Sequence, residues 1–122
     1  MSEEAIQIDD KELLTLAAKA VDIDLLAEEW EDGFIYYYYK IPGDTQGWNP
    51  LNCDSDALRL AVKLGVRGYF DVEIQKGSVQ VTSFEPYEHT AYEEFKIRTE
   101  DPHAAVRRAI VKAAAEIGRN HD

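Results

Sequence analysis

The stretch Val66–Phe84 constrains the fold more than any other part of the sequence, because apolar and polar side chains alternate along it in two runs. A period of two residues is typical of a β-strand with one face in the core and one face in water. Gln75–Ser78 interrupts the alternation and contains a glycine, so the stretch is predicted to form a β-hairpin. The alternating apolar positions are Val66, Phe70, Val72, Ile74, Val79 and Val81.

Apolar residues recur at helical spacing both before and after this hairpin. Asp9 or Asp10 can cap a first helix, which is predicted over about Lys11–Val21. Thr99–Pro102 favours a helix start, because acidic residues and a proline suit the first turn, and Gly118 is predicted to end this last helix. The stripe that the last helix buries consists of Val106, Ala109, Ile110, Ala113 and Ile117.

A further helix is predicted between these two. Asp54 or Ser55 can cap it, and Gly65 is well placed to end it. Its buried side is predicted to consist of Leu58, Ala61 and Val62, flanked by Leu60 and Leu64.

Two strands are predicted in addition to the hairpin. Phe34–Ile41 is rich in aromatic and β-branched residues, and Pro42–Asp44 ends it. Tyr92–Arg98 alternates again, so that it forms a meander with the hairpin. The acidic segment Asp22–Gly33 is interpreted as a helical turn, and residues 45–52 as a loop.

The resulting order, α-β-α-β-β-β-α, predicts an α+β fold in the form of a three-layer α/β/α sandwich around an antiparallel sheet of about four strands. A length of 122 residues suits a single domain over residues 1–122, with a frayed start at 1–8 and a tail at 119–122. The core is expected to bury Phe70, Val72 and Ile74 beneath Val106, Ile110 and Ile117.

The formal net charge of −11 is distributed unevenly along the chain. Residues 1–33 carry eleven acidic residues and only two lysines. Binding to a phosphate backbone needs concentrated lysine and arginine, so direct nucleic-acid binding is not expected. An acidic face suits a basic protein partner, including a protein that normally holds nucleic acid. The alternative is that the acidity only keeps the protein soluble.

Several classes of function lack the residues that they need. No apolar run approaches the roughly 18 to 20 residues of a membrane span, and the sequence start does not look like a signal peptide, so a cytoplasmic protein without membrane contact is expected. Cys53 is the single cysteine, which excludes an intramolecular disulfide. The three histidines lack metal-ligand spacing, and phosphate-binding loops are absent, so neither a metal nor a cofactor is predicted.

The aromatic strand and the acidic segment supply the candidate binding residues. Tyr37 and Tyr39 share one side of the predicted strand, and with Trp48 they can stack a ligand or anchor a protein. Arg107 and Arg108 are candidates to hold an anion beside them. The alternative is that the sheet is covered on both faces and the phenols only reach its rim. The acidic candidates, with the tryptophan among them, are Glu28, Glu29, Trp30 and Glu31.

Two long runs are similar to a known family. Trp48–Gly65 reads WNPLNCDSDALRLAVKLG, and after the hairpin Thr99–Glu116 reads TEDPHAAVRRAIVKAAAE. Together with the helical run ELLTLAAKAV, Glu12–Val21, they resemble the small bacteriophage proteins of the phage ABA sandwich domain family. The sequence differs from that family at Asp22–Gly33, where a glycine and a tryptophan usually stand. The resemblance implies a phage or prophage gene and helices on both sides of a sheet, and it supplies no catalytic residues.

Three functions are compatible with these features. The first is a non-enzymatic phage or prophage accessory protein that binds a basic host protein; in its sharpest form it inhibits a host defence protein by imitating the charge of nucleic acid. The second is a protein that binds or sequesters a small ligand or nucleotide. The third is an enzyme with an unfamiliar site, which rests only on the carboxylates and His89. A monomer or a small homo-oligomer suits each of them.

Overall fold

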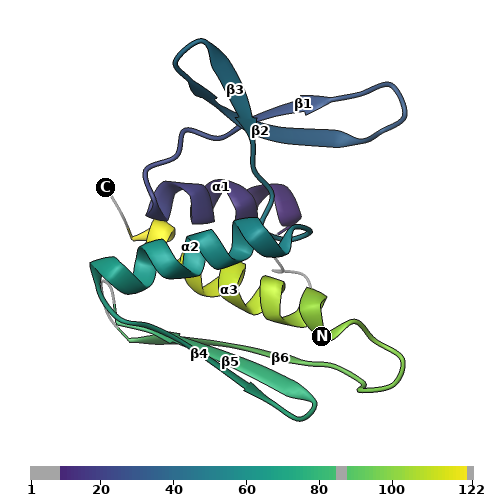
Figure 1. Cartoon of the computed structure of the whole chain (residues 1–122), viewed down its shortest axis with the longest axis vertical. Coiled ribbons are helices and arrows are strands. Elements are labelled where there is room, and N and C mark those ends of the chain that lie inside the picture. Colours follow the sequence, from purple (N-terminus) through teal and green to yellow (C-terminus); the bar gives the residue numbers. More distant parts are fainter. Residues whose placement is uncertain (1–8, 85–87, 121–122) are drawn as a thin grey trace.

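The computed structural model describes residues 9–84 and 88–120, which form three helices and two three-stranded antiparallel sheets. The predicted α+β class is confirmed. The single sheet of about four strands is wrong, because the strands divide into two sheets. The helices lie between these sheets (Figure 1), so the central layer is helical and the expected α/β/α order is not seen. The predicted frayed start at 1–8 and the last two tail residues, 121 and 122, lie outside the described residues.

The three helices are α1 Asp10–Ala20, α2 Asp54–Arg67 and α3 Pro102–Arg119. Asp9 caps α1, because its carboxylate accepts a hydrogen bond of 2.9 Å from the N–H of Glu12. Asp101 caps α3 in the same way, by accepting a bond of 2.9 Å from the N–H of His103. The predicted first and last helices are therefore confirmed, with the last one extending past Gly118.

The second helix is confirmed in its position but not in its buried side. It continues beyond Gly65 to Arg67, and the residues that it buries are Ala57, Leu60 and Leu64. Leu58 and Val62, which were expected in the core, point to solvent instead. Apolar residues recur at helical spacing on two sides of α2, so the sequence pattern alone does not distinguish the side that faces α3.

The lower sheet contains the predicted hairpin. Its strands are β4 Phe70–Gln75, β5 Ser78–Ser83 and β6 His89–Glu94, in that order across the sheet. Gly77 in the turn has a φ of 82°, a conformation that favours glycine. Two boundaries differ from the prediction: Val66 belongs to α2, and the last strand begins before Tyr92 and ends at Glu94, although the alternation continues to Arg98.

The hairpin buries its second strand against the helices more fully than its first. Val79 and Val81 of the central strand β5 are completely buried. On the neighbouring edge strand, Phe70 and Val72 are only partly buried and Ile74 is 62% exposed, so the expected burial of this trio is wrong. An edge strand has a neighbour on one side only, which explains why the central strand supplies the core residues instead. On α3, Ile110 and Ile117 are buried as expected and Val106 is half-buried.

The upper sheet contains β1 Leu26–Glu29, β2 Ile35–Ile41 and β3 Asp44–Gly47, in that order. The predicted tyrosine strand is confirmed. The acidic segment Asp22–Gly33 is not a helical turn, because it supplies β1 and the turn that leads into β2. Residues 45–47, expected in a loop, complete β3. Both segments, which were predicted as other structures, become strands because they pair with β2. Their own composition does not indicate a strand.

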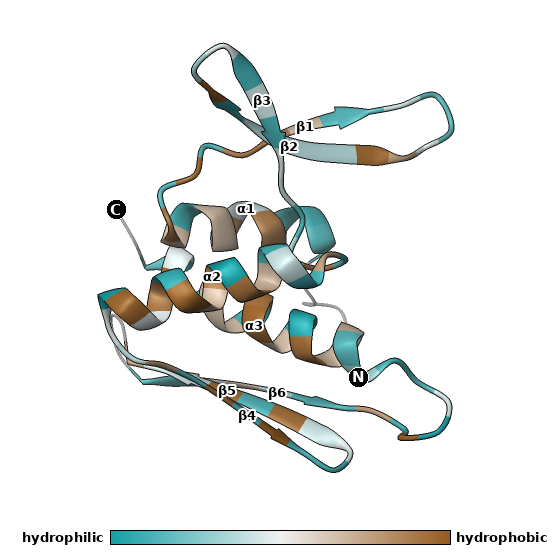
Figure 2. Ribbon diagram, viewed as in Figure 1, coloured by the Kyte–Doolittle hydropathy of each residue, from teal (hydrophilic) through white to brown (hydrophobic). Residues whose placement is uncertain are grey.

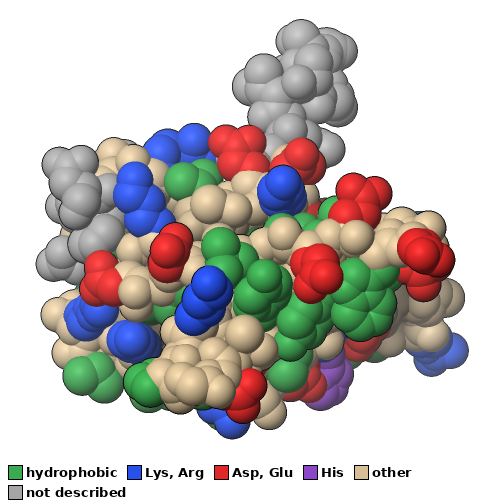
Figure 3. All heavy atoms as spheres, turned by 90° about the horizontal axis from the view of Figure 1, so that it is seen from above, with side chains coloured by type: hydrophobic (Ala, Val, Ile, Leu, Met, Phe, Trp, Pro, Cys, Tyr) green, Lys and Arg blue, Asp and Glu red, His purple; other side chains and the backbone are tan. Residues whose placement is uncertain are grey.

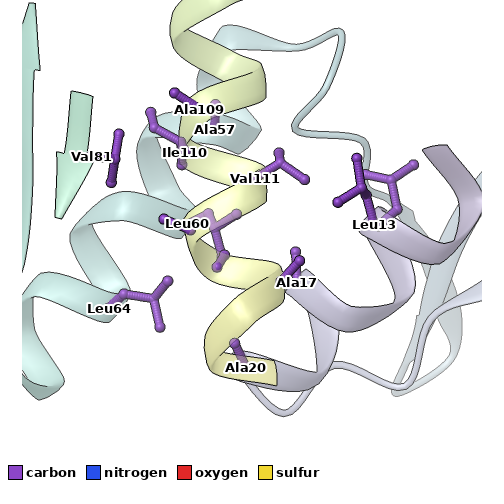
Figure 4. Packing of buried hydrophobic residues seen from close by; sticks show 14 of the residues in the cluster. Leu13, Ala17, Ala20, Ala57, Leu60, Leu64, Val81, Ala109, Ile110 and Val111 are labelled. Atoms are coloured by element: carbon purple, nitrogen blue, oxygen red, sulfur yellow. The ribbon is translucent and has the colours of Figure 1, made fainter. Parts of the chain in front are cut away.

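The contact between α1 and α3 is more extensive than that between any other two elements. It is built from small side chains: Ala17 and Ala18 of α1 and Ala113 and Ala114 of α3 are completely buried. Figure 4 shows Ala17 and Ala20 where α1 lies beside α3. Gly118 lies inside this contact, where a Cβ atom would lie only 1.7 Å from the carbonyl oxygen of Leu16.

Replacing Gly118 by alanine should therefore destabilise the protein by about 3 kcal/mol, because the added methyl group forces the two helix backbones apart. Gly65 in α2 is the matched control, since a Cβ atom there meets only the carbonyl oxygen of Phe70 at 3.9 Å. Gly65→Ala should be neutral or stabilise by about 0.5–1 kcal/mol through helix propensity. Urea denaturation of both variants tests this, and a Gly118→Ala protein as stable as the wild type would contradict it.

Candidate functional site

The pairing of β1 with β2 joins the acidic segment to the tyrosine strand. Glu28 lies opposite Tyr36 and Leu26 lies opposite Tyr38, and residues opposite each other in an antiparallel pair share a face of the sheet. The pairing continues beyond β1, because the N–H of Trp30 donates a hydrogen bond of 2.7 Å to the carbonyl oxygen of Phe34. One face of the upper sheet thus combines a carboxylate with four aromatic side chains.

These four rings form a continuous series, which we call the aromatic ladder: Trp30, Phe34, Tyr36 and Tyr38. The ring centroids of Trp30 and Phe34 are 5.2 Å apart, those of Trp30 and Tyr36 5.9 Å, and those of Tyr36 and Tyr38 5.4 Å. Such separations are typical of favourable aromatic pairs. Gly47 of β3 leaves room for the ladder, because a Cβ atom there would lie 3.0 Å from the hydroxyl oxygen of Tyr36.

The ladder is open to solvent at its acidic end. The side chains of Trp30 and Phe34 are 50% and 48% exposed. A hollow of about 540 Å³ is lined there by Glu28, Glu29, Trp30, Glu31 and Asp32. Seen from above, hydrophobic side chains form a band with carboxylates beside it (Figure 3). Within residues 9–84 and 88–120, no ion pair neutralises Glu28, Glu29 or Glu31. Glu28 lies on the same side of the sheet as the ladder, whereas Glu29, opposite Ile35, lies on the other side and reaches the same hollow at its rim. We call these three carboxylates and the aromatic ladder the acidic aromatic face.

Tyr37 and Tyr39 alternate with Tyr36 and Tyr38 along β2, so they lie on the other face of the sheet and point toward the helices. Tyr37 is buried in the core, and this burial, followed by the charges of Asp10 and Asp9, raises the pKa of its phenol. Trp48 is also buried, and its backbone N–H donates a hydrogen bond of 3.0 Å to the carbonyl oxygen of Tyr37. Two of the three predicted aromatic candidates are thus mainly core residues, which favours the alternative of a covered face for them.

Tyr39 and Trp48 nevertheless line one hollow of about 350 Å³ between the upper sheet and α2. Arg59, Lys63 and Asp56 of α2 contribute to its walls. The sequence did not single out Arg59 or Lys63, because their convergence with Tyr39 depends on how the sheet is placed over the helix. The hollow therefore combines aromatic surface with two cationic side chains.

Arg107 and Arg108 do not join that hollow. Arg107 is mostly buried, where its Nη1 lies 2.7 Å from a carboxylate oxygen of Asp54 and its Nε donates a bond of 2.8 Å to the carbonyl oxygen of Leu51. Arg108 pairs with Asp10 at 2.8 Å. Both arginines are engaged by carboxylates of other helices, so their role as anion holders beside Tyr39 has no support in this arrangement.

Asp54 is the centre of a polar cluster between the starts of α2 and α3. One oxygen accepts from Arg107, and the other lies 3.0 Å from Nδ1 of His103. The hydrogen bond from Arg107, followed by that with His103, holds the pKa of Asp54 below its ordinary value. In the sequence, Asp54 is a possible helix cap, and nothing local to it indicates partners 49 and 53 residues away.

The other chemical candidates are dispersed. His89 of β6 lies opposite Ser83 in the sheet. Within the described ranges, no group of three or more histidine, cysteine, aspartate or glutamate side chains is placed to hold a metal ion. None of the helices in the part of the chain that the structure describes is long and apolar enough to cross a membrane.

Replacing Asp54 by asparagine tests the polar cluster through its pH dependence. A carboxylate whose pKa is lowered by folding stabilises the protein above its unfolded value, near 3.8, and this contribution is lost as the pH falls through the lower folded value. The wild type should therefore be more stable than Asp54→Asn at about pH 6, and the difference should shrink below about pH 3.8. Urea denaturation across this range measures it, with Asp71→Asn as the control for losing one charge. A difference that grows on acidification would contradict the assignment.

Comparison of the chain with protein-family models, with curated proteins and with solved structures finds no match. The likeness to the phage ABA sandwich domain family therefore stays a prediction from the sequence.

Proposed function

We propose that the protein acts by binding a basic partner protein through the acidic aromatic face. The observation that carries this proposal is the arrangement at the open end of the upper sheet. Glu28 shares a face with the aromatic ladder through the register of β1 on β2, and Glu29 and Glu31 line the hollow beside the exposed ring of Trp30. Aromatic anchors of this kind contribute most of the binding energy in protein interfaces, and carboxylates around them attract basic partners over a distance.

The chemistry of the face suits arginine and lysine in particular. A guanidinium can stack on an exposed ring such as that of Trp30 while it donates hydrogen bonds to a neighbouring carboxylate. Within the described residues, Glu28, Glu29 and Glu31 form no ion pair, so a basic partner can pair with them without displacing a cation of this chain. Such pairing adds to the gain from covering the rings.

The family resemblance supplies a biological setting for this binding activity. We place the protein among phage or prophage accessory proteins that work in the cytoplasm of the host cell without catalysing a reaction. In the sharpest form of the proposal, the partner is a host defence protein whose basic surface normally holds nucleic acid, and the carboxylates replace the phosphates.

Reversing the charges of Glu28, Glu29 and Glu31 together to lysine should abolish binding of a partner that the wild-type protein retains from the native host. Trp30→Ala should weaken that binding by at least about 30-fold, the effect of losing roughly 2 kcal/mol at an interface anchor. Raising the salt concentration should weaken the wild-type complex as well, because screening shortens the reach of the carboxylates. Mass spectrometry identifies the partner, and calorimetry then measures its affinity.

The matched control reverses three exposed carboxylates outside the upper sheet, Glu12, Glu88 and Glu94, so that the net charge changes by the same amount. This control should keep most of the affinity. A complex that is insensitive both to salt and to reversal at the acidic aromatic face would exclude the proposal.

The hollow beside Tyr39 and Trp48 favours a second candidate function, the binding of a small anionic ligand. Its aromatic wall can cover a flat ring, and Arg59 and Lys63 can neutralise a phosphate or carboxylate group. The volume of about 350 Å³ is near the lower end for ligand pockets, which suits a ligand of nucleotide size or smaller.

A thermal-shift screen against nucleotides and small anionic metabolites tests this second function. A ligand present at 100 times its dissociation constant should raise the unfolding free energy by about 2.7 kcal/mol. Lys63→Ala should remove that shift, whereas Lys96→Ala, which changes an exposed lysine far along the chain, should keep it. The absence of a shift with every anion would contradict this function and leave the protein-binding proposal intact.

A further inference from the structure

The first strand of the lower sheet has an open edge. Within the described residues, β4 pairs with β5 on one side and with no strand on the other. The two-residue turn at Lys76–Gly77 makes Gln75 and Ser78 a hydrogen-bonded pair, and such pairs alternate along an antiparallel ladder. The backbone N–H and C=O groups of Val72 and Ile74 therefore point toward the open edge.

An apolar groove runs beside this edge. It has a volume of about 420 Å³ and lies between α2, α3 and β4. Most of its wall consists of aliphatic side chains, and Figure 2 shows apolar residues on β4 and along α2. The apolar residues that line it include Ala57, Leu58, Ala61, Val72, Ile74 and Val106.

The apolar surface extends from the groove along α2. Leu58, Val62 and Val66 follow one another at intervals of four residues, and their side chains are 64%, 55% and 83% exposed. Contiguous exposed apolar surface of this kind marks interaction sites in soluble proteins. Leu58 belongs both to this stripe and to the groove beside the open edge of β4. The sheet that contains β4 lies on the other side of the helical layer from the sheet of β1, β2 and β3 (Figure 1).

The outer face of β4 is acidic. Asp71 and Glu73 are exposed, and they lie opposite Thr82 and Gln80 of β5, which supply no positive charge. The strand thus alternates between apolar residues toward the groove and carboxylates toward solvent. An added strand in which apolar and basic side chains alternate would place the apolar ones in the groove and the basic ones beside the carboxylates.

We propose that β4 accepts an extended segment of a partner protein as an additional strand, in which apolar side chains alternate with lysine or arginine. The backbone of this segment bonds to the outward groups of Val72 and Ile74. Its apolar side chains enter the groove, and its basic side chains lie beside Asp71 and Glu73. The six residues of β4 set the length of the segment at about the same number.

A second copy of this chain is a poorer occupant of the same edge. If two β4 strands paired in antiparallel fashion around Val72, each Asp71 would face Glu73 of the other copy. Like charges directly opposite each other destabilise a strand pair. The charge pattern therefore selects a basic segment from another protein.

A fluorescein-labelled peptide of alternating valine and lysine tests the proposal on the full-length protein. We expect it to bind with a dissociation constant at least about tenfold lower than two comparison peptides. One comparison peptide alternates valine with glutamate, and the other has the same composition with all valines before all lysines. Fluorescence anisotropy measures the affinities, and amide chemical shifts should change along β4. Equal affinity for the alternating and blocked lysine peptides would overturn the proposal.

Two variants, at side chains of similar exposure, distinguish binding at β4 from a general attraction of a basic peptide to an acidic protein. Ile74→Lys places a positive charge at the groove and should weaken peptide binding by at least about tenfold, since an inward charge protects an edge strand. Tyr92→Lys introduces the same charge on the other edge strand, β6, and should leave binding nearly unchanged. Equal effects of the two variants would contradict the proposal. A wild-type dimer that is stable in sedimentation experiments, and that Ile74→Lys dissociates, would also contradict the proposal.

Discussion

The close approach of α1 and α3 is the contact on which the rest of the structure depends. Alanines and Gly118 let the two helix backbones come together, and this pair then offers one side to each sheet. α2 packs against α3 through Leu60 and Leu64, and β5 packs against α3 through Val79 and Val81. Small side chains thus allow a short distance between α1 and α3, while larger aliphatic residues pack α2 and β5 against this pair of helices.

The elements that local chemistry determines were predicted correctly. Asp9 or Asp10 and the run Thr99–Pro102 indicated the two helix starts, where Asp9 and Asp101 are the caps, and the alternation around Gly77 indicated the hairpin. The segment that became β1 was not predicted, because Leu26–Glu29 has the composition of a helix or loop and becomes a strand only by pairing with β2. Because β1 was not predicted, the division of the strands into two sheets was not predicted either.

The candidate site was predicted in part for the same reason. The sequence pointed to Trp30 and the neighbouring glutamates through their unusual density, but it selected Tyr37 and Tyr39 instead of Tyr36 and Tyr38. Strand parity separates these two pairs, yet only the placement of the sheet over the helices determines which pair is buried. The contact between Asp54 and Arg107 was not predicted for a similar reason: the two residues lie 53 positions apart in the sequence, and only the packing of α2 against α3 brings them together.

The upper sheet is joined to the helical layer by few buried side chains, chiefly those of Tyr37 and Trp48. We therefore expect its hydrogen bonds to open at a lower free energy than those of the lower sheet, whose central strand β5 is covered by α3. On this expectation, β1 separates from β2 and pairs with it again while the helices stay folded. For the binding that we propose, such local opening would let the hairpin of β1 and β2 adjust its twist to the surface of the partner.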